Sequence, residues 1–371
     1  MRQKEAQNTA GPVIDLSTMA GYQLIVPRKK HNELKDLNFA NLDDPRVAEI
    51  KTNLRDRVDA LWPDLNKFKN CEFVPSGTDA NRLAVELAGE NEVIICSSLT
   101  HVSILEALKK RVGKRIIILH PDESHTVSTE VIGNALVINP HALVCVTYGP
   151  TLGIANSGTK TDIVLPDTLP DGIKLHLDAT YGGFNIGILE PDKFQGLCRP
   201  FDSVTIKPAK FVGAHGVAML YHNYDEGLQQ APYYPAITTA GISTSVPVYP
   251  ALSALHTMQQ LGLEGMQNFA KQVYKVRDAI AEELKNVGLN LMAPLTSPVI
   301  PVKADSEEHM HKMVENARQA GYMILPLEYT NQSCTTHGVR LVVAPLQHFL
   351  QDPNIAKKIA LALSKGEKWV V

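Results

Sequence analysis

Short apolar runs alternate with helix-like segments over the middle of the chain. Helical spacing appears at 46–62, near 80–87 and at 103–111. The runs that look like buried strands are Glu92–Cys96, Arg115–Leu119, Ala142–Thr147 and Lys174–Leu177. Strands that are apolar throughout and separated by helices are typical of a mostly parallel sheet with helices on both faces. We therefore predict an α/β fold with a mostly parallel central sheet wrapped by helices.

The pattern changes after a long helical region at 251–286. Strand-like and helix-like runs then follow at 297–303, 306–319, 322–328, 339–344 and 353–364. This order predicts a separate, smaller α+β unit. We expect three parts: an irregular arm at 1–45, a large domain at 46–255 and a small C-terminal domain at 256–371.

Composition favours an ordinary globular protein that acts on small molecules. The 371 residues are 44% hydrophobic and 20% charged, and the formal net charge is −3. No excess of positive charge favours nucleic acid or an anionic membrane as a partner. The first residues have no apolar core typical of a signal peptide, and no apolar stretch is long enough to span a membrane. The five cysteines lack metal-ligand spacing. We expect a soluble, cytoplasmic protein without a metal site.

Asp178 and Lys210 are the most informative pair of residues in the chain. Each follows a short apolar run, Ile173–Leu177 or Ser203–Ile206, and ligands of open α/β sheets collect at the carboxyl ends of such strands. A lysine amine can hold the aldehyde of pyridoxal phosphate as a Schiff base, and a carboxylate can keep the pyridine nitrogen protonated. We interpret the pair as a pyridoxal phosphate site. Taken singly, the residues are explained as a turn-capping aspartate and a surface lysine.

A phosphate site is predicted at Ser76, Gly77 and Thr78. These residues precede the amphipathic run Arg82–Ala88, so they lie at a helix N-terminus. Unpaired backbone N–H groups and the positive end of the helix dipole favour an anion there, and the hydroxyls of Ser76 and Thr78 can add donors. A capping turn that binds nothing is the alternative.

Three further side chains are candidates for contacts in the site. His101 lies just before a helical run, where its ring can stack on a cofactor, although it can also be purely structural. Thr151 follows the strand that ends at Thr147 and can reach the cofactor's edge, unless it belongs to a plain turn. Arg340 enters an apolar strand, where it can bind a substrate carboxylate or simply face solvent.

Together these motifs resemble the group II pyridoxal-phosphate-dependent amino-acid decarboxylases of fold type I, especially the small tyrosine/aspartate decarboxylase-like subgroup. The matching segments are Gly77–Asn81 for the phosphate, His101–Ile104 for the ring-stacking histidine, Asp178 with Ala179 for the pyridine nitrogen, and Lys210 for the Schiff base. The resemblance covers about residues 41–345. It implies a lyase that decarboxylates an L-amino acid, and it adds Ala179 and Ser243 to the cofactor contacts.

Departures from that family keep other functions open. The family usually has histidine directly before its lysine and Asp or Asn three residues before it, whereas this chain has Ala209 and Lys207. Lys207 is therefore a rival for the Schiff base, although the alignment favours Lys210. A carbon–carbon lyase of the sphingosine-phosphate lyase type and a catalytically idle relative that binds the cofactor are the alternatives.

A homodimer with active sites at the interface is also expected. The arm carries apolar residues at Val13–Leu16 and Tyr22–Val26 but too few regular elements to bury them alone. In family members, a segment corresponding to Thr238–Ser245 reaches across to the neighbour's phosphate. The alternative is a monomer whose arm folds over its own small domain.

Overall fold

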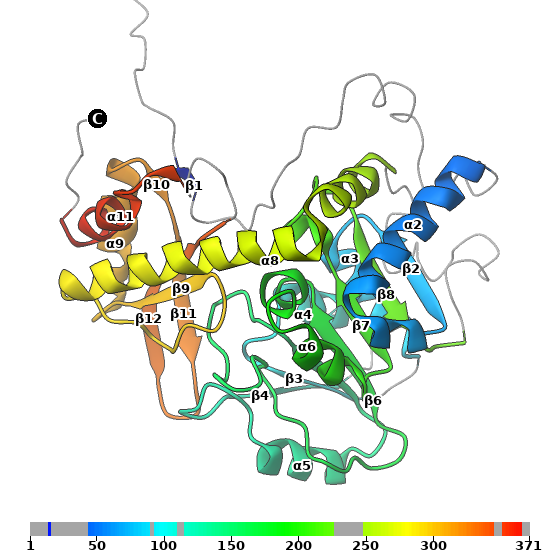
Figure 1. Ribbon diagram of the computed structural model, residues 1–371. Helices are drawn as coiled ribbons and strands as arrows, with labels where there is room; N and C mark the ends of the chain where they lie inside the picture. Colours follow the sequence, from blue (N-terminus) through cyan, green and yellow to red (C-terminus); the bar gives the residue numbers. More distant parts are fainter. Residues whose placement is uncertain are drawn as a thin grey trace, which may run out of the picture.

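The computed structural model describes residues 14–15, 44–89, 93–109, 115–225, 248–344 and 351–365. Two groups of elements lie toward opposite ends of the long helix α8, Val248–Asn286 (Figure 1). The larger group contains α2 (Pro45–Leu61), η1 (Pro63–Lys67), β2 (Asn70–Val74), α3 (Gly77–Leu87), β3 (Val93–Ser97), α4 (Val102–Lys109), β4 (Arg115–Leu119), α5 (Thr129–Ile138), β5 (Leu143–Thr147), β6 (Lys174–Ala179), η2 (Gly183–Gly187), α6 (Pro191–Cys198), β7 (Ser203–Ile206), η3 (Pro208–Lys210) and β8 (Ala218–His222).

The central sheet confirms the predicted fold class. Its seven strands have the order β2-β8-β7-β6-β5-β3-β4, and every neighbouring pair is parallel except the two that involve β8. Because β2 and β7 are both antiparallel to β8, they run in the same direction. The carboxyl ends of β2, β3, β5, β6 and β7 therefore meet at one edge of the sheet.

Both faces of the central strand β5 (Leu143–Thr147) are buried, which explains its long apolar run. In β5, Leu143 and Cys145 face one hydrophobic cluster while Val144 and Val146 face another. The first cluster includes residues of α3 and α4, and the second includes residues of α2, α5, α6 and α8. Side chains alternate between the two faces of a strand, so such a two-sided strand has no polar face.

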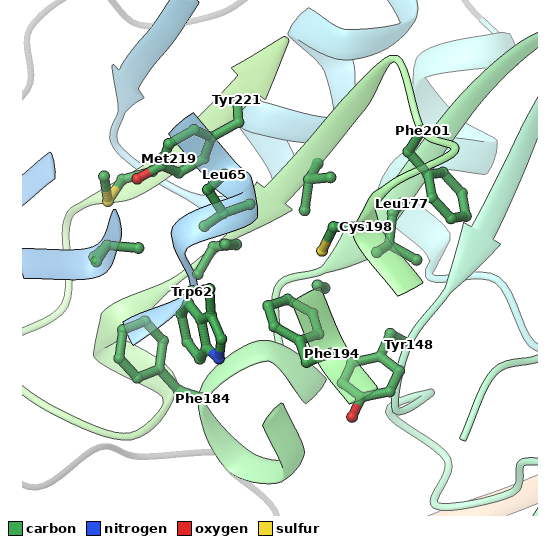
Figure 2. Packing of buried hydrophobic residues seen from close by; sticks show 14 of the residues in the cluster. Trp62, Leu65, Tyr148, Leu177, Phe184, Phe194, Cys198, Phe201, Met219 and Tyr221 are labelled. Carbon is green, nitrogen blue, oxygen red and sulfur yellow. The ribbon is translucent and has the colours of Figure 1, made fainter. Parts of the chain in front are cut away.

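An aromatic cluster joins the segments before β2 to those after β6 (Figure 2). The ring of Trp62 lies 5.1 Å from Phe184 and 4.9 Å from Phe194, both in edge-to-face geometry. The Trp62 indole nitrogen donates to the carbonyl of Gly187 over 3.4 Å. Full burial of a large apolar side chain contributes about 1.5–3 kcal/mol. The cluster therefore holds the start of the large unit against the turn that follows Asp178.

The smaller group of elements is an antiparallel sheet covered by helices, as the sequence predicts. Its sheet has the order β11-β12-β9, and two further short strands, β1 and β10, pair in parallel. The elements are β1 (Ile14–Asp15), β9 (Val299–Lys303), α9 (Glu307–Gln319), β10 (Tyr322–Met323), β11 (Leu325–Thr330), β12 (Thr335–Val342) and α11 (Ile355–Lys365). The pairing of β1 with β10 places this part of the arm on the chain's own small unit.

Helix α8 packs in both groups. Its residues up to Ala270 belong to the large hydrophobic cluster, and residues from Val273 belong to the cluster of the small unit. Gly262 interrupts the helix with φ 62°, a left-handed conformation that glycine adopts without a Cβ penalty. The predicted boundary at 255/256 lies inside this helix, so the domain division stays a prediction.

Candidate active site

A cavity opens at the edge of the sheet where the strands' carboxyl ends meet. Its volume is about 140 Å³. The lining residues come from the segments that follow β2, β3, β5, β6 and β7: Ser76, Gly77, Thr78, Asn81, His101, Ser103, Thr147, Gly149, Thr151, Asp178, Thr180, Tyr181, Lys207 and Lys210. Seven of the predicted site residues are therefore brought together.

Asp178 is the last residue but one of β6, and it is buried. Its two carboxylate oxygens have different partners. Oδ1 accepts from the backbone N–H of Thr180 over 3.0 Å, and Oδ2 accepts from Asn81 Nδ2 over 2.8 Å. Hydrogen bonds from donors stabilise an ionised carboxylate in a buried place. The chain therefore fixes Asp178 as an acceptor at the base of the cavity.

Lys210 ends the short helical turn η3, directly after β7. The pKa of its amine is lowered to about 8, first by burial and then by the positive charge of Lys207, while Asp178 opposes the shift. A lysine with such a pKa is partly neutral near pH 8, and the neutral amine is the nucleophilic form. Lys210 thus combines a nucleophile with a nearby carboxylate in one cavity.

The N-terminus of α3 forms one wall of the cavity. Ser76 is the N-cap: its Oγ accepts from the N–H of Asp79 over 3.1 Å and donates to the Asp79 carboxylate over 2.6 Å. This is the capping turn that the sequence left open as an alternative, and it faces the cavity. The first N–H groups of a helix have no partner within the helix, so they remain suited to an anion.

Gly77 is required by the close approach of Thr180. A Cβ at Gly77 would lie 2.5 Å from Thr180 Cγ2 and 2.9 Å from its Oγ1. A side chain here would push the residue after Asp178 and Ala179 away from the helix end. The glycine therefore keeps the two predicted cofactor-binding segments in contact.

His101 lines the cavity with a neutral ring. Burial lowers the pKa of its imidazole, and the charges of Lys210 and Arg340 act in the same direction, while Asp178 opposes them. Its Nδ1 accepts from the backbone N–H of Ser103 over 3.1 Å and lies 2.8 Å from Ser103 Oγ. An acceptor Nδ1 leaves the proton of the neutral ring on Nε2.

Arg340 reaches the site from the small unit. It lies on β12, and its Nη1 donates to the carbonyl of Thr151, which lines the cavity, over 2.9 Å. Its charge lowers the pKa of both His101 and Lys210, so the guanidinium lies close to the two side chains. Arg340 itself is not among the cavity-lining residues. It is nevertheless placed to present a cation beside the cavity.

One predicted cofactor contact is absent from the cavity wall, and another cannot be placed because it lies outside the described residues. Ala179 is fully buried in the large hydrophobic cluster and is not among the lining residues. Ser243 lies outside the residues that the structure describes. Ala209, which replaces the histidine usual in the family, is also fully buried and does not line the cavity.

Lys207 lines the same cavity as Lys210. Burial lowers the pKa of its amine, and the charge of Asp79 at the helix N-terminus opposes this. The cationic groups in or beside the cavity, Lys207, Lys210 and Arg340, outnumber the two carboxylates of Asp178 and Asp79. The electrostatics therefore favour ligands with several negative charges.

Removing the charge of Lys207 should raise the pKa of Lys210 above about 8, because a neighbouring cation disfavours a second one. The rate at which cofactor-free protein binds pyridoxal phosphate should depend on pH. In the Lys207→Ala variant, the midpoint of this dependence should move to higher pH. Stopped-flow absorbance measures this rate. An unchanged or lower midpoint would contradict the assigned interaction.

A buried carboxylate supports the segments behind the cavity. Asp162 accepts from Ser97 Oγ over 2.6 Å, from Thr100 Oγ1 over 3.2 Å and from the N–H of Thr147 over 2.6 Å. It thus joins the end of β3, just before His101, to the end of β5. Burial raises the pKa of Asp162 to about 6, although these hydrogen bonds act against the shift.

The sequence interpretation missed several residues that line the cavity. Asn81, Ser103, Thr147, Thr180 and Tyr181 all belong to, or directly follow, segments that carry a predicted site residue. Residue spacing relative to Asp178 and His101 could have suggested them. The direction of each side chain, however, depends on turns that the sequence pattern does not define.

The residues fit pyridoxal phosphate on two counts. Thr180 Oγ1 is buried at the cavity and has no hydrogen-bond partner within the described part of the chain, so a polar ligand can satisfy it. The cavity also offers a group for each part of the cofactor: an amine for the aldehyde, a carboxylate for the ring nitrogen and a helix N-terminus for the phosphate. The described residues contain no cluster of three or more potential metal ligands.

Comparisons with known proteins agree with this fit. No protein-family model matches the chain. The probable L-aspartate decarboxylase of Thermococcus gammatolerans is 27% identical in an alignment of 340 residues, and the alignment covers 84% of each chain. The L-aspartate decarboxylase of Thermococcus kodakarensis is 26% identical in an alignment of 349 residues, and the alignment covers 86% of each chain.

The fold has solved counterparts. The structure of glutamate decarboxylase from Lactobacillus brevis CGMCC 1306 has a TM-score of 0.74 and 14% identity, covering 96% of this chain and 90% of that one. Within the described residues, no helix is long and apolar enough to cross a membrane. The chain is thus a homologue of the L-aspartate and L-tyrosine/L-aspartate decarboxylases, with the fold of the pyridoxal-phosphate-dependent fold type I enzymes.

Proposed function

We propose that the protein decarboxylates an L-amino acid with pyridoxal phosphate bound in the cavity, and that L-aspartate is its substrate. The observation that carries this proposal is that Lys210, Asp178 and the N-terminus of α3 line one cavity. Names of the relatives at 26–27% identity supply the substrate. The excess of cations beside the cavity supports an acidic amino acid.

Each part of the site has a distinct role in this reaction. Pyridoxal phosphate, when bound, supplies an electron sink for the carbanion left by departing carbon dioxide. Lys210 provides the amine that binds the cofactor aldehyde, and Asp178 holds a proton at the ring nitrogen. The N–H groups at the start of α3 bind the phosphate. His101 would contribute its ring to the cavity wall beside the cofactor, with Nε2–H as a donor.

Arg340 and Lys207 are the candidate partners of the substrate's carboxylates. The hydrogen bond from its Nη1 to the carbonyl of Thr151 holds Arg340 beside the cavity, and a guanidinium has the donor geometry that a carboxylate accepts. Lys207 adds a second cation at the cavity wall. A substrate with two carboxylates matches two cations better than a neutral amino acid does.

The reaction is tested by incubating purified protein with pyridoxal phosphate and each of the twenty amino acids, with carbon dioxide and amine as products. We expect aspartate to give both products in equal amounts. A phosphorylated long-chain amino alcohol tests the lyase alternative. Cofactor binding without carbon dioxide from any amino acid would favour the catalytically idle alternative.

A homodimer with shared active sites is part of the proposal. It rests on the family resemblance and on the hydroxyl-rich segment 238–245, which lies outside the described residues. The pairing of Ile14–Asp15 with the chain's own β10 removes part of the reason to seek a partner for the arm. The segment at 238–245 therefore carries the argument for shared sites.

Mixing two inactive variants should restore part of the activity. One subunit carries Lys210→Ala and the other carries Ser243→Ala with Thr244→Ala, so a mixed dimer has one site with both intact sets. Up to about one quarter of normal activity is expected from random mixing, because half of the dimers are mixed and each has one intact site. A monomeric mass by light scattering at a concentration with full activity would contradict sharing.

A further inference from the structure

Asn81 lies at the centre of the hydrogen-bond network behind the cavity. It is on α3, and only 1% of its surface is exposed. Its Nδ2 donates to Asp178 Oδ2 over 2.8 Å and to Ser103 Oγ over 3.1 Å. Its Oδ1 lies 3.2 Å from His176 Nε2. The amide group thus has partners on three different segments.

These partners allow only one orientation of the Asn81 amide. Asp178 accepts through both oxygens, from the N–H of Thr180 at Oδ1 and from Asn81 Nδ2 at Oδ2, so its carboxylate faces the NH₂ group. Burial lowers the pKa of His176, which is therefore neutral, and its Nδ1 lies 2.9 Å from Ser203 Oγ. With Nδ1 accepting from Ser203, Nε2–H donates to Asn81 Oδ1. In a flipped amide, Asn81 Oδ1 would face Asp178 Oδ2, so two acceptors would meet. The NH₂ group would then face His176 Nε2–H, so two donors would meet.

The second proton of the same NH₂ group reaches the His101 side of the site. Ser103 Oγ accepts this proton from Asn81, so its own hydroxyl proton is available for His101 Nδ1, 2.8 Å away. The backbone N–H of Ser103 also donates to Nδ1. Two donors on Nδ1 place the ring proton on Nε2.

We propose that Asn81 is a positioning residue that holds the Asp178 carboxylate for the pyridine nitrogen and, through Ser103, fixes the tautomer of His101. The inference rests on the proposed function, because both groups act on bound pyridoxal phosphate. A single amide would thus position both groups that act on the cofactor ring: the Asp178 carboxylate and the His101 imidazole. Such partners of a site residue commonly decide its orientation.

The matched variants are Asn81→Leu, which keeps the branching and the number of heavy atoms without donors, Asn81→Ala, and the control Asn139→Ala. Asn139 is also buried and binds Arg115 and the carbonyl of Ala135, but it lies at the end of α5 and not at the cavity. If one Asn81 variant does not fold, the other carries the test. Ser103→Ala interrupts only the His101 side.

Three measurements separate positioning from plain stabilisation. Absorbance titration gives the cofactor dissociation constant, which should rise about tenfold in the Asn81 variants, the effect of about 1.4 kcal/mol. The ¹⁵N signal of the cofactor's ring nitrogen should move toward its unprotonated value. In cofactor-free protein, the imidazole ¹⁵N signals of His101 should show a mixture of tautomers in the Asn81 and Ser103 variants.

The control decides how these results are interpreted. Asn139→Ala should lower the free energy of unfolding and leave all three signals as in the wild type. A folded Asn81 variant with wild-type cofactor affinity and an unchanged ring-nitrogen signal would overturn this inference alone. A wild-type protein that binds no pyridoxal phosphate would overturn the proposed function and this inference with it.

Discussion

Replacing Lys210 with alanine should abolish covalent trapping of pyridoxal phosphate by borohydride and reduce carbon dioxide release to background. Lys210 lines the same cavity as Asp178, and the pKa of its amine is lowered to about 8. Alanine has no amine to bind the aldehyde. Mass spectrometry of the reduced, digested protein locates the modified lysine.

The matched control is Lys207→Ala, which removes the other lysine of the same cavity wall. This variant should still be trapped at Lys210, although its pH dependence should shift. If the cofactor is instead found on Lys207 and survives the loss of Lys210, the assigned motif register is wrong by three residues.

Asp178→Asn should bind pyridoxal phosphate yet turn over at least ~100-fold more slowly, since lost electrostatic stabilisation in a buried site costs several kcal/mol. Asparagine cannot supply the negative charge that keeps the ring nitrogen protonated. Its NH₂ group would also replace the acceptor that Asn81 Nδ2 now binds at 2.8 Å. Steady-state carbon dioxide release at saturating cofactor measures the effect.

Asp59→Asn serves as the control for this substitution. Asp59 is buried as well, but its partner is Tyr221 on β8, and it does not line the cavity. We expect reduced stability and normal turnover from it. Near-normal turnover in Asp178→Asn would remove the carboxylate from the mechanism.

The large unit could be predicted because most of its strands are short runs rich in Val, Ile and Leu that alternate with helical segments. Ser203–Ile206 is a strand with the predicted bounds, and Arg115–Leu119 is as well. The hairpin of the small unit was placed less well. β12 begins at Thr335, not 339, because its first residues are polar and partly exposed, so the apolar pattern appears only in its second half.

The motifs that form the site could be predicted from the sequence, but the contacts between their side chains could not. Seven predicted residues line the cavity because each motif follows a strand, and the strands' carboxyl ends meet. Asn81 was inside a recognised motif, yet its role depends on the helical phase of α3 relative to Asp178 on another strand. Ala179 points into the core because side chains alternate along β6. Such directions follow from packing between distant segments.

Asp162 also has a thermodynamic consequence through proton linkage. Its pKa in the folded protein is about 6 against an ordinary value of 3.8, so the folded state binds more protons than the unfolded state between about pH 4 and 6. The free energy of unfolding should therefore fall as pH rises through this window, opposite to the effect of an ion-paired aspartate. Denaturant titrations of Asp162→Asn should lack this component. Through Asp162, mild acid should therefore raise the free energy of unfolding.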